Sequence, residues 1–445
     1  MDIHQRLALS GIAIPELLFP KAGIDLQKWA VIACDQFTQD YAYWEAVKKL
    51  VGAAPSTLNL ILPEIFLAEP HDAGTTARIA AIHDTMAAYL AQGLLVPGER
   101  GAVYIERKTP FHEQRRGLVL CVDLEQYDWK PEARPLIRST EGTVEARLPP
   151  RMAVRRNAAL ETSHILLLID DEDDALLSAL GERAKQAEPL YTTELSMDSG
   201  AVSGWLLKRE ADWAYLAEAL EGLAARSGKR YGGASDTPFL FAVGDGNHSL
   251  ASAKAIWLEY KAAHKGEEGL AKHPARYALV EIENLYDAGI AFEPIHRVIF
   301  GASLASVSAA LAALPSFSSR AVASREELAA LVGDAACERN RLGLVSGGSY
   351  LLVESERQGL ATDTLQPLLD AFIAGNAAYS IDYIHGEDSL FQTAQGGTVG
   401  LLLPPIDKRT LFKTVAQRGP LPRKSFSMGE AKEKRFYLEC RKLFR

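Results

Sequence analysis

A polar turn near the middle of the chain contains residue types that could bind and act on a phosphate group. Gly244, Asp245, Gly246, Asn247 and His248 follow one another directly. A carboxylate can act as a base or bind a metal ion, an imidazole can hold or move a proton, and glycine lets the backbone turn sharply. These residues predict a ligand-binding turn. The structural alternative is an ordinary Asp-Gly turn followed by a helix cap.

The sequence on either side of this turn predicts a strand before it and a helix after it. Residues 239–243 are apolar or small and carry no charge, as in a strand that is buried on both faces. From Ser249 onward, Leu250, Ala253 and Trp257 recur at helical spacing. Open α/β sheets bind ligands at the carboxyl ends of strands, and the free N–H groups at a helix start favour an anion. We therefore expect a phosphate or similar anion at this turn.

A pair of arginines upstream of the turn predicts a second anion contact. Pro149 and Pro150 suit the first turn of a helix, so Arg151 and Arg155, at i and i+4, project from one side of it. Paired guanidinium groups suit phosphate or carboxylate, although a solvated helix face with surface ion pairs has the same pattern. Glu141 is the only carboxylate in the polar turn before this helix, and it could be a base, a magnesium ligand or a capping acid.

Three further basic residues could contact an anion. Arg297 follows His296 in an apolar stretch that predicts a strand, and neighbours on a strand face opposite ways, so only one of them can point into a site. Arg423 and Lys424 lie in the basic C-terminal part of the chain, where residues 418–445 hold nine Lys or Arg and three Glu. A solvated charged tail explains this composition equally well.

The composition is that of an ordinary globular protein. The chain has 445 residues, 48% hydrophobic and 24% charged, which allows two or three domains and a large core. The net charge of −9 argues against nucleic acid as a partner, so we expect a small molecule or nucleotide as ligand. The four cysteines are far apart and favour reduced thiols in the cytoplasm. We expect neither a membrane span nor a signal peptide, and the sequence leaves the oligomeric state open.

The order of the predicted elements indicates an α/β to α+β protein with a mixed sheet. We expect strands at 29–33, 58–62, 102–107, 117–123, 164–170 and 275–283, and amphipathic helices at 41–51 and 75–92. We expect a nucleotide- or phosphate-binding core over residues 1–300 and a small Ala/Ser-rich subdomain or insertion over 301–360. The C-terminal region over 361–445 is expected to pack its basic tail back on the core.

Four stretches taken together resemble the family known as domain of unknown function 1015. They are GDGNHSLASAK, RSTEGTVEARLPPR, FEPIHRV and LPRKS, and the resemblance runs from about Trp29 to the C-terminus. The usual family turn, Asp-Gly-His-His-Arg-Tyr, corresponds to the residues from Asp245 to Leu250. It looks like the turn of ParB-type domains, sulfiredoxin and free-serine kinases, which use nucleotides. The resemblance implies a ParB/sulfiredoxin-like core that binds a nucleotide phosphate, with Ser249 here in place of the family's arginine.

These observations favour a magnesium-assisted phosphotransferase that uses ATP or another nucleotide and acts on a small hydroxyl-bearing metabolite. Glu141 or Asp245 would be the base or Mg²⁺ ligand, and His248 would hold phosphate together with the helix amides. The two helix arginines and Lys424 would neutralise the phosphate. Further expected phosphate or cofactor contacts are Gly244, Gly246, Asn247, Ser249, Arg297 and Arg423.

Two alternatives belong to other functional classes. The missing arginine at Ser249 suggests a regulatory module that binds a nucleotide without turnover. The same turn, together with the basic tail, suggests a ParB-like phosphodiesterase or nuclease, which the negative net charge disfavours.

Overall fold

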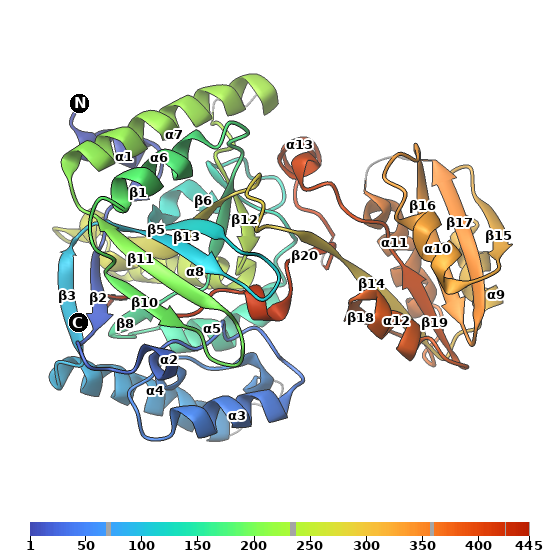
Figure 1. The fold of residues 1–445 in the computed structure, drawn as a ribbon, viewed down its shortest axis with the longest axis horizontal. Coiled ribbons are helices and arrows are strands. Elements are labelled where there is room, and N and C mark those ends of the chain that lie inside the picture. The colour runs from blue at the N-terminus through green and yellow to red at the C-terminus, as the bar shows by residue number, and fades with distance from the viewer. Residues whose placement is uncertain (68–72, 232–236, 357–359, 423, 445) are drawn as a thin grey trace. The chain divides into compact units, whose positions relative to one another are not determined.

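The chain folds into two compact units, which are described separately (Figure 1). The computed structural model describes residues 1–67, 73–231, 237–356, 360–422 and 424–444. Unit 1 comprises Met1–Ile290, Val415–Gly419 and Glu430–Arg445, and unit 2 comprises Ala291–Thr414 and Pro420–Gly429. The α/β to α+β class with a mixed sheet is confirmed.

The expected core ended at residue 300, whereas the first part of unit 1 ends at Ile290. Strand β14 (Phe292–Phe300) belongs to unit 2, because it pairs with β18 (Ser380–His385) and β19 (Thr398–Leu402). For the same reason residues 301–360 are part of a larger sheet rather than a separate subdomain. The segment from residue 430 onward, called the C-terminal segment below, belongs to unit 1.

Unit 1 is built on a mixed sheet with helices on both faces. Its strands are β1 (Ile12–Ala13), β4 (Ala102–Lys108), β5 (Arg115–Asp123), β6 (Tyr127–Asp128), β7 (Ile137–Ser139), β9 (Leu166–Ile169), β10 (Tyr191–Glu194), β11 (Ala201–Leu207), β12 (Phe241–Asp245) and β13 (Tyr277–Asn284). They lie in the order β10-β11-β4-β5-β13-β9-β12-β7-β6, and β1 pairs with β5. The pairs β9–β13, β7–β12 and β6–β7 are parallel, whereas β9–β12 is antiparallel.

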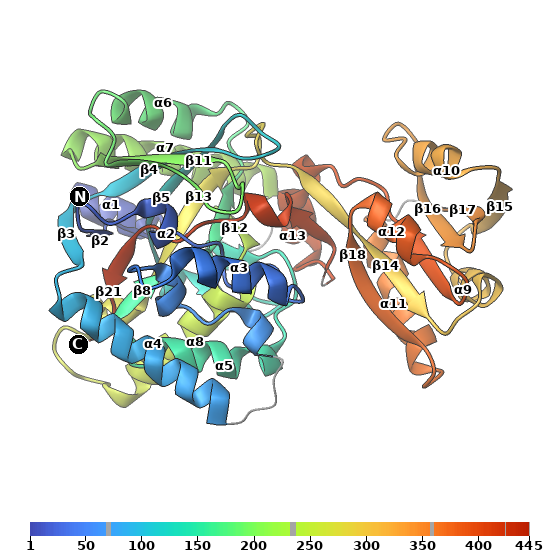
Figure 2. The same cartoon turned by 60° about the horizontal axis from the view of Figure 1, so that its bottom comes forward.

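Both faces of this sheet are covered, which explains the uncharged sequence of β9 and of the first part of β12. The helices of unit 1 are α1 (Ile3–Leu9), α2 (Leu26–Trp29), α3 (Tyr41–Val51), α4 (Ala73–Ala91), α5 (Leu148–Arg155), α6 (Ala175–Ala184), α7 (Glu210–Tyr231) and α8 (Asn247–Ala263). Figures 1 and 2 show α1, α6 and α7 on one side of the sheet and α3, α4, α5 and α8 on the other. Short 3₁₀ helices connect them: η1 (Thr57–Leu60), η2 (Glu64–Phe66), η3 (Leu124–Gln126), η4 (Glu145–Arg147), η5 (Leu270–Lys272), η6 (Pro274–Arg276) and η8 (Ala431–Glu433).

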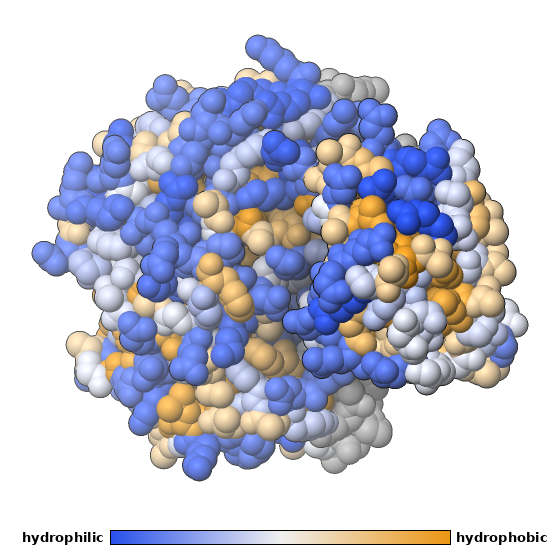
Figure 3. All heavy atoms as spheres, turned by 45° about the vertical axis from the view of Figure 1, so that its right-hand side comes forward, coloured by the Kyte–Doolittle hydropathy of each residue, from blue (hydrophilic) through white to orange (hydrophobic). Residues whose placement is uncertain are grey.

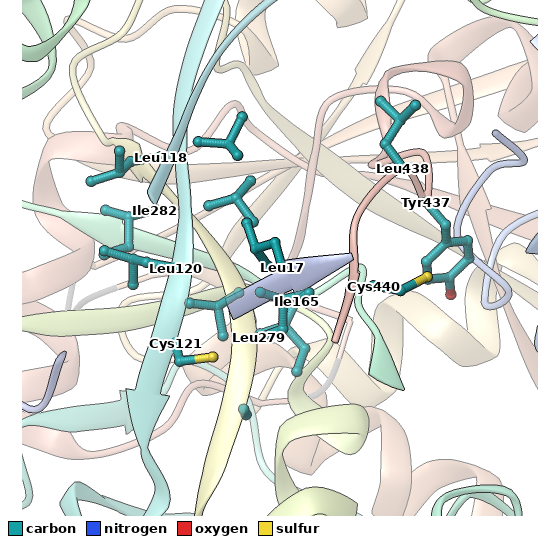
Figure 4. Packing of buried hydrophobic residues seen from close by; sticks show 14 of the residues in the cluster. Leu17, Leu118, Leu120, Cys121, Ile165, Leu279, Ile282, Tyr437, Leu438 and Cys440 are labelled. Carbon is teal, nitrogen blue, oxygen red and sulfur yellow. The ribbon is translucent and has the colours of Figure 1, made fainter. Parts of the chain in front are cut away.

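A second, antiparallel sheet of unit 1 includes the end of the chain. Its strands are β2 (Glu16–Pro20), β3 (Leu95–Arg100), β8 (Leu160–Thr162) and β21 (Cys440–Lys442), in the order β3-β2-β21-β8. Cys440 pairs with Leu18 on one side and with Thr162 on the other. Figure 4 shows Tyr437, Leu438 and Cys440 among the buried side chains of the unit 1 core. The C-terminal segment is therefore an interior part of unit 1.

Unit 2 has its own sheet and its own apolar core. Besides β14, β18 and β19 it contains β15 (Ser318–Val322), β16 (Arg339–Ser346), β17 (Ser349–Glu356), β20 (Phe426–Met428), α9 (Leu304–Leu311), α10 (Arg325–Val332), α11 (Ala361–Ala374), α12 (Glu387–Thr393) and η7 (Lys408–Thr410). The strand order is β15-β17-β16-β19-β14-β18, with β20 paired to β14. Helix α13 (Leu411–Arg418) contains the boundary between the units at Thr414. Gly347 and Gly348 form the turn of a hairpin between β16 and β17, in which Ser346 pairs with Ser349.

Two of the expected strands of unit 1 are wrong. Residues 29–33 follow α2, whose Asp25 cap accepts a hydrogen bond from the N–H of Gln27, and they contribute only an isolated bridge between Ile32 and Phe436. Residues 58–62 begin inside the 3₁₀ helix η1, where Ser56 caps the N–H of Leu58. Most residues of both runs are buried, but local capping determines their backbone conformation.

The described helices include none that is both long and apolar enough to cross a membrane. On the face of the molecule seen in Figure 3, hydrophilic side chains predominate and hydrophobic ones occur singly or in small groups.

Candidate functional site

The expected strand, turn and helix around Asp245 are present in unit 1. Strand β12 ends at Asp245, α8 begins at Asn247, and Gly246 between them has a φ of +77°. A Cβ atom added to Gly246 would lie 3.1 Å from Cα of Ile165, the residue just before β9. The left-handed backbone and this close approach together require glycine.

Replacing Gly246 with Ala should therefore destabilise unit 1 by about 1–2 kcal/mol, the cost of a left-handed conformation for a residue with a Cβ atom. Gly222→Ala is the matched control: it lies inside α7 with nothing within 4 Å of its added Cβ, so the same change there should stabilise by up to about 1 kcal/mol. Urea unfolding followed by tryptophan fluorescence measures both effects, because all six tryptophans lie in unit 1. Equal stability of Gly246→Ala and wild type would contradict the assignment of strain.

The carboxylate of Asp245 is paired with a lysine from the C-terminal segment. Nζ of Lys434 lies 3.1 Å from Oδ2 of Asp245, and only 6% of the lysine side chain is exposed. The other oxygen, Oδ1, accepts a hydrogen bond of 2.9 Å from the N–H of Gly246. The turn therefore presents a nearly buried ammonium group beside the start of α8.

Two buried arginines hold this lysine in place through the backbone. Arg107 donates hydrogen bonds to the carbonyl oxygens of Lys432 at 2.7 Å, Glu433 at 2.8 Å and Lys434. Arg115 donates to the same carbonyl of Glu433 at 2.8 Å. Both arginines lie on the central strands β4 and β5, so the sheet fixes the path of the C-terminal segment past the turn.

The polar turn that contains Glu141 lies beside the turn that contains Asp245. Strands β7 and β12 are parallel neighbours, so their carboxyl ends meet at one edge. Thr140 donates a hydrogen bond of 2.6 Å to the carbonyl of Val243, and the N–H of Val144 donates to Nε2 of His248 at 3.3 Å. His248 thus connects the two turns. At the start of α8, Oδ1 of Asn247 is buried and has no hydrogen-bond partner among the described residues.

A cavity of about 120 Å³ opens next to the start of α8. Ser249 and Ser252 of α8, and Arg151 and Arg155 of α5, contribute to its wall. The remaining wall is mostly apolar and includes Leu60, Ile61, Leu62, Met86, Val154, Leu160 and Leu443. A helix start, two arginines and an apolar wall therefore meet in one cavity of unit 1.

Both cavity arginines already have carboxylate partners. Arg151 pairs with Glu64 and Arg155 with Glu161, and all four residues line the cavity. Burial, and then the neighbouring Asp35, raise the pKa of Glu64 despite Arg151. Burial opposes the charge on Glu161 as well, but Arg155 and Arg441 lower its pKa overall.

The structure adds three residues that sequence reasoning did not select: Asp35, His164 and Tyr437. Nε2 of His164 lies 3.4 Å from Oδ2 of Asp35, and Nδ1 is 2.7 Å from the hydroxyl of Tyr437. Burial lowers the pKa of His164, but Asp35, Asp245 and Glu64 more than offset this and raise it. His164 in turn holds the pKa of Asp35 below its usual range in spite of burial. The three residues are too far apart in sequence for any spacing motif to reveal them.

Two of the expected anion contacts, Arg297 and Lys424, belong to unit 2. Arg297 is fully buried inside unit 2, where its guanidinium donates to Oε1 of Gln366 at 3.1 and 3.2 Å and to the carbonyl of Ile295. Its strand neighbour His296 accepts a hydrogen bond of 3.1 Å from the N–H of Leu403, so both side chains are buried and hydrogen-bonded inside unit 2. Lys424 is exposed and also belongs to unit 2, and Arg423 lies outside the described residues.

The expected Mg²⁺ ligands, Glu141 and Asp245, do not form a metal site of their own. Among the described residues no group of three or more His, Cys, Asp or Glu side chains could hold a metal ion. Asp245 is also occupied by the ammonium group of Lys434. The donor set does not fit a protein-built Mg²⁺ site, and a metal role for these carboxylates stays a prediction.

Comparison with solved structures gives only distant similarities. A conserved hypothetical protein from Pyrococcus furiosus is 11% identical, with 72% of this chain and 90% of that chain covered and a TM-score of 0.34. A mutant free serine kinase in complex with ADP is 10% identical, with 73% and 92% covered and a TM-score of 0.39. SbnI with a C-terminal truncation, from Staphylococcus aureus, is 10% identical, with 70% and 82% covered and a TM-score of 0.36. Likenesses this weak support no conclusion about the site.

A comparison with curated proteins gives no match. The family model described as "Protein of unknown function (DUF1015)" matches residues 18–372, which is most of the chain and includes the turn at Asp245 and the α5 arginines. Three of the four stretches that resemble this family lie inside the matched range, and LPRKS, at residues 421–425, lies beyond it. The chain therefore belongs to the DUF1015 family.

Proposed function

We propose that unit 1 binds a nucleotide by its phosphates at the start of α8 and transfers a phosphoryl group to a small hydroxyl-bearing metabolite. The observation that carries this proposal is the cavity itself, where Ser249 in the first turn of α8 meets Arg151 and Arg155. Free N–H groups and the positive end of a helix favour phosphate, and guanidinium groups neutralise it. The apolar part of the wall suits the uncharged part of a ligand.

Lys434 is the further charge that we assign to phosphate binding. Its ammonium group pairs with Asp245 at the turn before α8, and a cation at that place stabilises the negative charge that phosphoryl transfer must handle. Asp245 would hold this lysine, and a role for Asp245 as base is tested separately below. His248, Glu141, Gly244, Gly246 and Asn247 would shape the two turns and offer polar groups to the ligand.

A nucleotide screen tests the proposal directly. Purified protein is heated with each nucleoside mono-, di- and triphosphate, with and without Mg²⁺, and the unfolding of unit 1 is followed by tryptophan fluorescence. A ligand at 100 times its dissociation constant adds about 2.7 kcal/mol of stability, which such a screen detects. Nucleotide hydrolysis or transfer is then measured with pools of small alcohols. Absence of any stabilising nucleotide would refute the proposal.

A regulatory nucleotide-binding module without turnover is the second candidate. It is favoured by Ser249 in place of an arginine and by the carboxylate partners that Arg151 and Arg155 already have. Saturable nucleotide binding with no transfer to any alcohol in the pools would favour this candidate over the first.

A substitution in α5 distinguishes arginines that contact a ligand from arginines that only form ion pairs within the protein. Arg151→Lys should weaken nucleotide binding roughly tenfold, because a planar two-pronged contact to phosphate is replaced by a single ammonium group. Arg156→Lys is the matched control at the C-cap of the same helix, since Arg156 pairs with Glu259 at 2.9 Å and does not line the cavity. Calorimetric titration measures both. Equal affinity of wild type and Arg151→Lys would remove Arg151 from the site.

We also propose a cytoplasmic location and no nucleic-acid partner. Cys34, Cys121, Cys337 and Cys440 are all free thiols, which suits a reducing compartment. The net charge of −9 opposes binding to a polyanion.

A further inference from the structure

We propose that Tyr437, His164 and Asp35 form a proton relay on the cavity wall, which removes the proton from the hydroxyl group that accepts the phosphoryl group. The inference rests on the proposed phosphotransferase function and identifies the base of the same site. Tyr437 and His164 line the cavity directly, and 21% of the Asp35 side chain is exposed beside His164. Tyr437 would be the catalytic residue, and His164 and Asp35 would act through it.

The partners of Tyr437 fix the direction of its hydrogen bonds. The backbone N–H of Cys34, which can only donate, lies 3.0 Å from the Tyr437 hydroxyl oxygen. The hydroxyl proton is thus available for Nδ1 of His164 at 2.7 Å. When Nδ1 accepts this hydrogen bond, the N–H of the neutral imidazole is on Nε2, which faces Asp35 at 3.4 Å. The arrangement is a hydroxyl, a base and an orienting carboxylate in line, as nucleophile-activating triads use.

The relay also lies beside the proposed phosphate position. Strands β9 and β12 are antiparallel, with Leu166 opposite Asp245, so the residues before β9 meet the end of β12. A Cβ atom on Gly246 would lie 3.5 Å from Cδ2 of His164. An acceptor hydroxyl in the cavity can therefore reach both Tyr437 and a phosphate at the start of α8.

The proposed step balances without any further reactant than a nucleoside triphosphate and an alcohol. The acceptor O–H bond breaks and its proton goes to the Tyr437 oxygen, while the Tyr437 proton moves to Nδ1 of His164. The freed electron pair of the acceptor oxygen forms the bond to the γ-phosphorus. The bond from that phosphorus to the bridging oxygen breaks, and a nucleoside diphosphate leaves with the electron pair. Asp35 stabilises the imidazolium that His164 has become, and water later removes the proton.

The surroundings of His164 set the pH at which the relay works. Asp35, Asp245 and Glu64 face His164 from three different segments and raise its pKa, while burial opposes them. Lys434 acts on Asp35 from the C-terminal segment. The relay needs neutral His164, so turnover should rise with pH through a pKa above the usual 6.5. Burial raises the pKa of the neighbouring Cys34 thiol, which therefore stays neutral and does not compete as a nucleophile.

The first test needs no substrate. Histidine-selective ¹⁵N NMR of the full chain follows the ring nitrogens against pH, and His164→Gln identifies the His164 signals among the ten histidines. We expect neutral His164 to carry its proton on Nε2, with a pKa above 6.5 that falls in Asp35→Asn. A wild-type His164 that titrates at or below 6.5, or carries its proton on Nδ1, would overturn the relay.

The second test uses turnover and nucleotide affinity together. Tyr437→Phe should lower turnover by about 10²–10⁴, the range for loss of an acid–base group, with nucleotide affinity unchanged. Tyr191→Phe is the matched control: Tyr191 is also buried, with 8% exposed against 2% for Tyr437, and it donates its hydroxyl to Glu439, but it does not line the cavity. It should leave turnover within about twofold, whereas Asp35→Asn should lower turnover and move its pH profile to more acidic values.

The outcomes separate the relay from the function on which it rests. If wild-type protein binds no nucleotide, the proposed function is refuted. The relay then has no phosphoryl acceptor to act on, even if the NMR titration shows the hydrogen bonds among its three residues. Nucleotide turnover that survives in Tyr437→Phe overturns the relay and leaves the proposed function standing. Loss of turnover in Tyr437→Phe and Tyr191→Phe alike would identify a packing effect, and would also overturn it.

Discussion

Replacing Lys434 with Met should weaken nucleotide binding about tenfold to 100-fold. A charge-assisted hydrogen bond contributes about 1.5–3 kcal/mol, and each 1.4 kcal/mol is a factor of ten in affinity. Methionine keeps most of the length and the apolar stem of the lysine, so it removes mainly the ammonium group. Calorimetric titration with the best nucleotide from the screen measures the change.

Asp245→Asn is the control that breaks the same 3.1 Å pair from the other side. Both variants lose the ion pair, but Lys434→Met removes a positive charge and Asp245→Asn removes a negative one. If phosphate binds here, Asp245→Asn should bind nucleotide as well as wild type or more tightly, because a repelling carboxylate is gone. Equal weakening in both variants would show that the pair only shapes the turn.

The same Asp245→Asn protein decides between the catalytic roles considered for this residue. As a general base, Asp245 would leave binding intact and cost about 10²–10⁴ in turnover when replaced. As a Mg²⁺ ligand, it would cost the Mg²⁺-dependent part of the affinity. As the holder of Lys434 alone, it would leave turnover much less affected than the Tyr437→Phe change does. A folded Asp245→Asn protein with unchanged affinity and unchanged turnover would remove Asp245 from the mechanism.

The local part of the site was predictable because its pattern is local. An uncharged run before Gly244 and helical spacing after Ser249 follow from burial of a strand and of one helix face, and both elements are present. Pro149 and Pro150 correctly placed the start of α5, and the i, i+4 spacing brought Arg151 and Arg155 to one cavity. The sequence did not show which residues these arginines contact. Glu64, the partner of Arg151, is 87 residues away from it.

The rest of the site depends on a chain path that no local pattern encodes. The chain leaves unit 1 after Ile290 and the C-terminal segment returns to it at Glu430, so Lys434 reaches Asp245 and Tyr437 reaches His164 from 273 residues away. The basic composition of this segment was visible, but a solvated tail has the same composition. Its path past the turn is fixed by Arg107 and Arg115, which donate hydrogen bonds to its backbone carbonyls, and such contacts leave no trace in the sequence.

Replacing Glu161 with Gln should destabilise unit 1 by about 3–5 kcal/mol, the cost of removing one partner from a buried ion pair. Its carboxylate is 2% exposed and pairs with Arg155 and Arg441, and it also accepts a hydrogen bond of 3.3 Å from the N–H of Leu279. These partners belong to α5, β21 and β13, so this cavity-lining side chain joins three elements of unit 1. Without the charge, two buried guanidinium groups lose their counter-ion.

The matched control is Glu221→Gln, which breaks an equally close but exposed pair between Glu221 and Arg6 and should change stability far less. Urea unfolding followed by tryptophan fluorescence compares the two variants in unit 1 alone. The pKa of Glu161 is lowered in the folded protein, so its stabilising effect is complete above the unfolded value of 4.5 and disappears as pH falls through the folded pKa. As the pH falls below 4.5, unit 1 of Glu161→Gln should therefore lose less stability than unit 1 of the wild type. Equal losses in Glu161→Gln and Glu221→Gln at neutral pH would mean that Arg155 and Arg441 find other partners, and that Arg155 is free to bind a ligand.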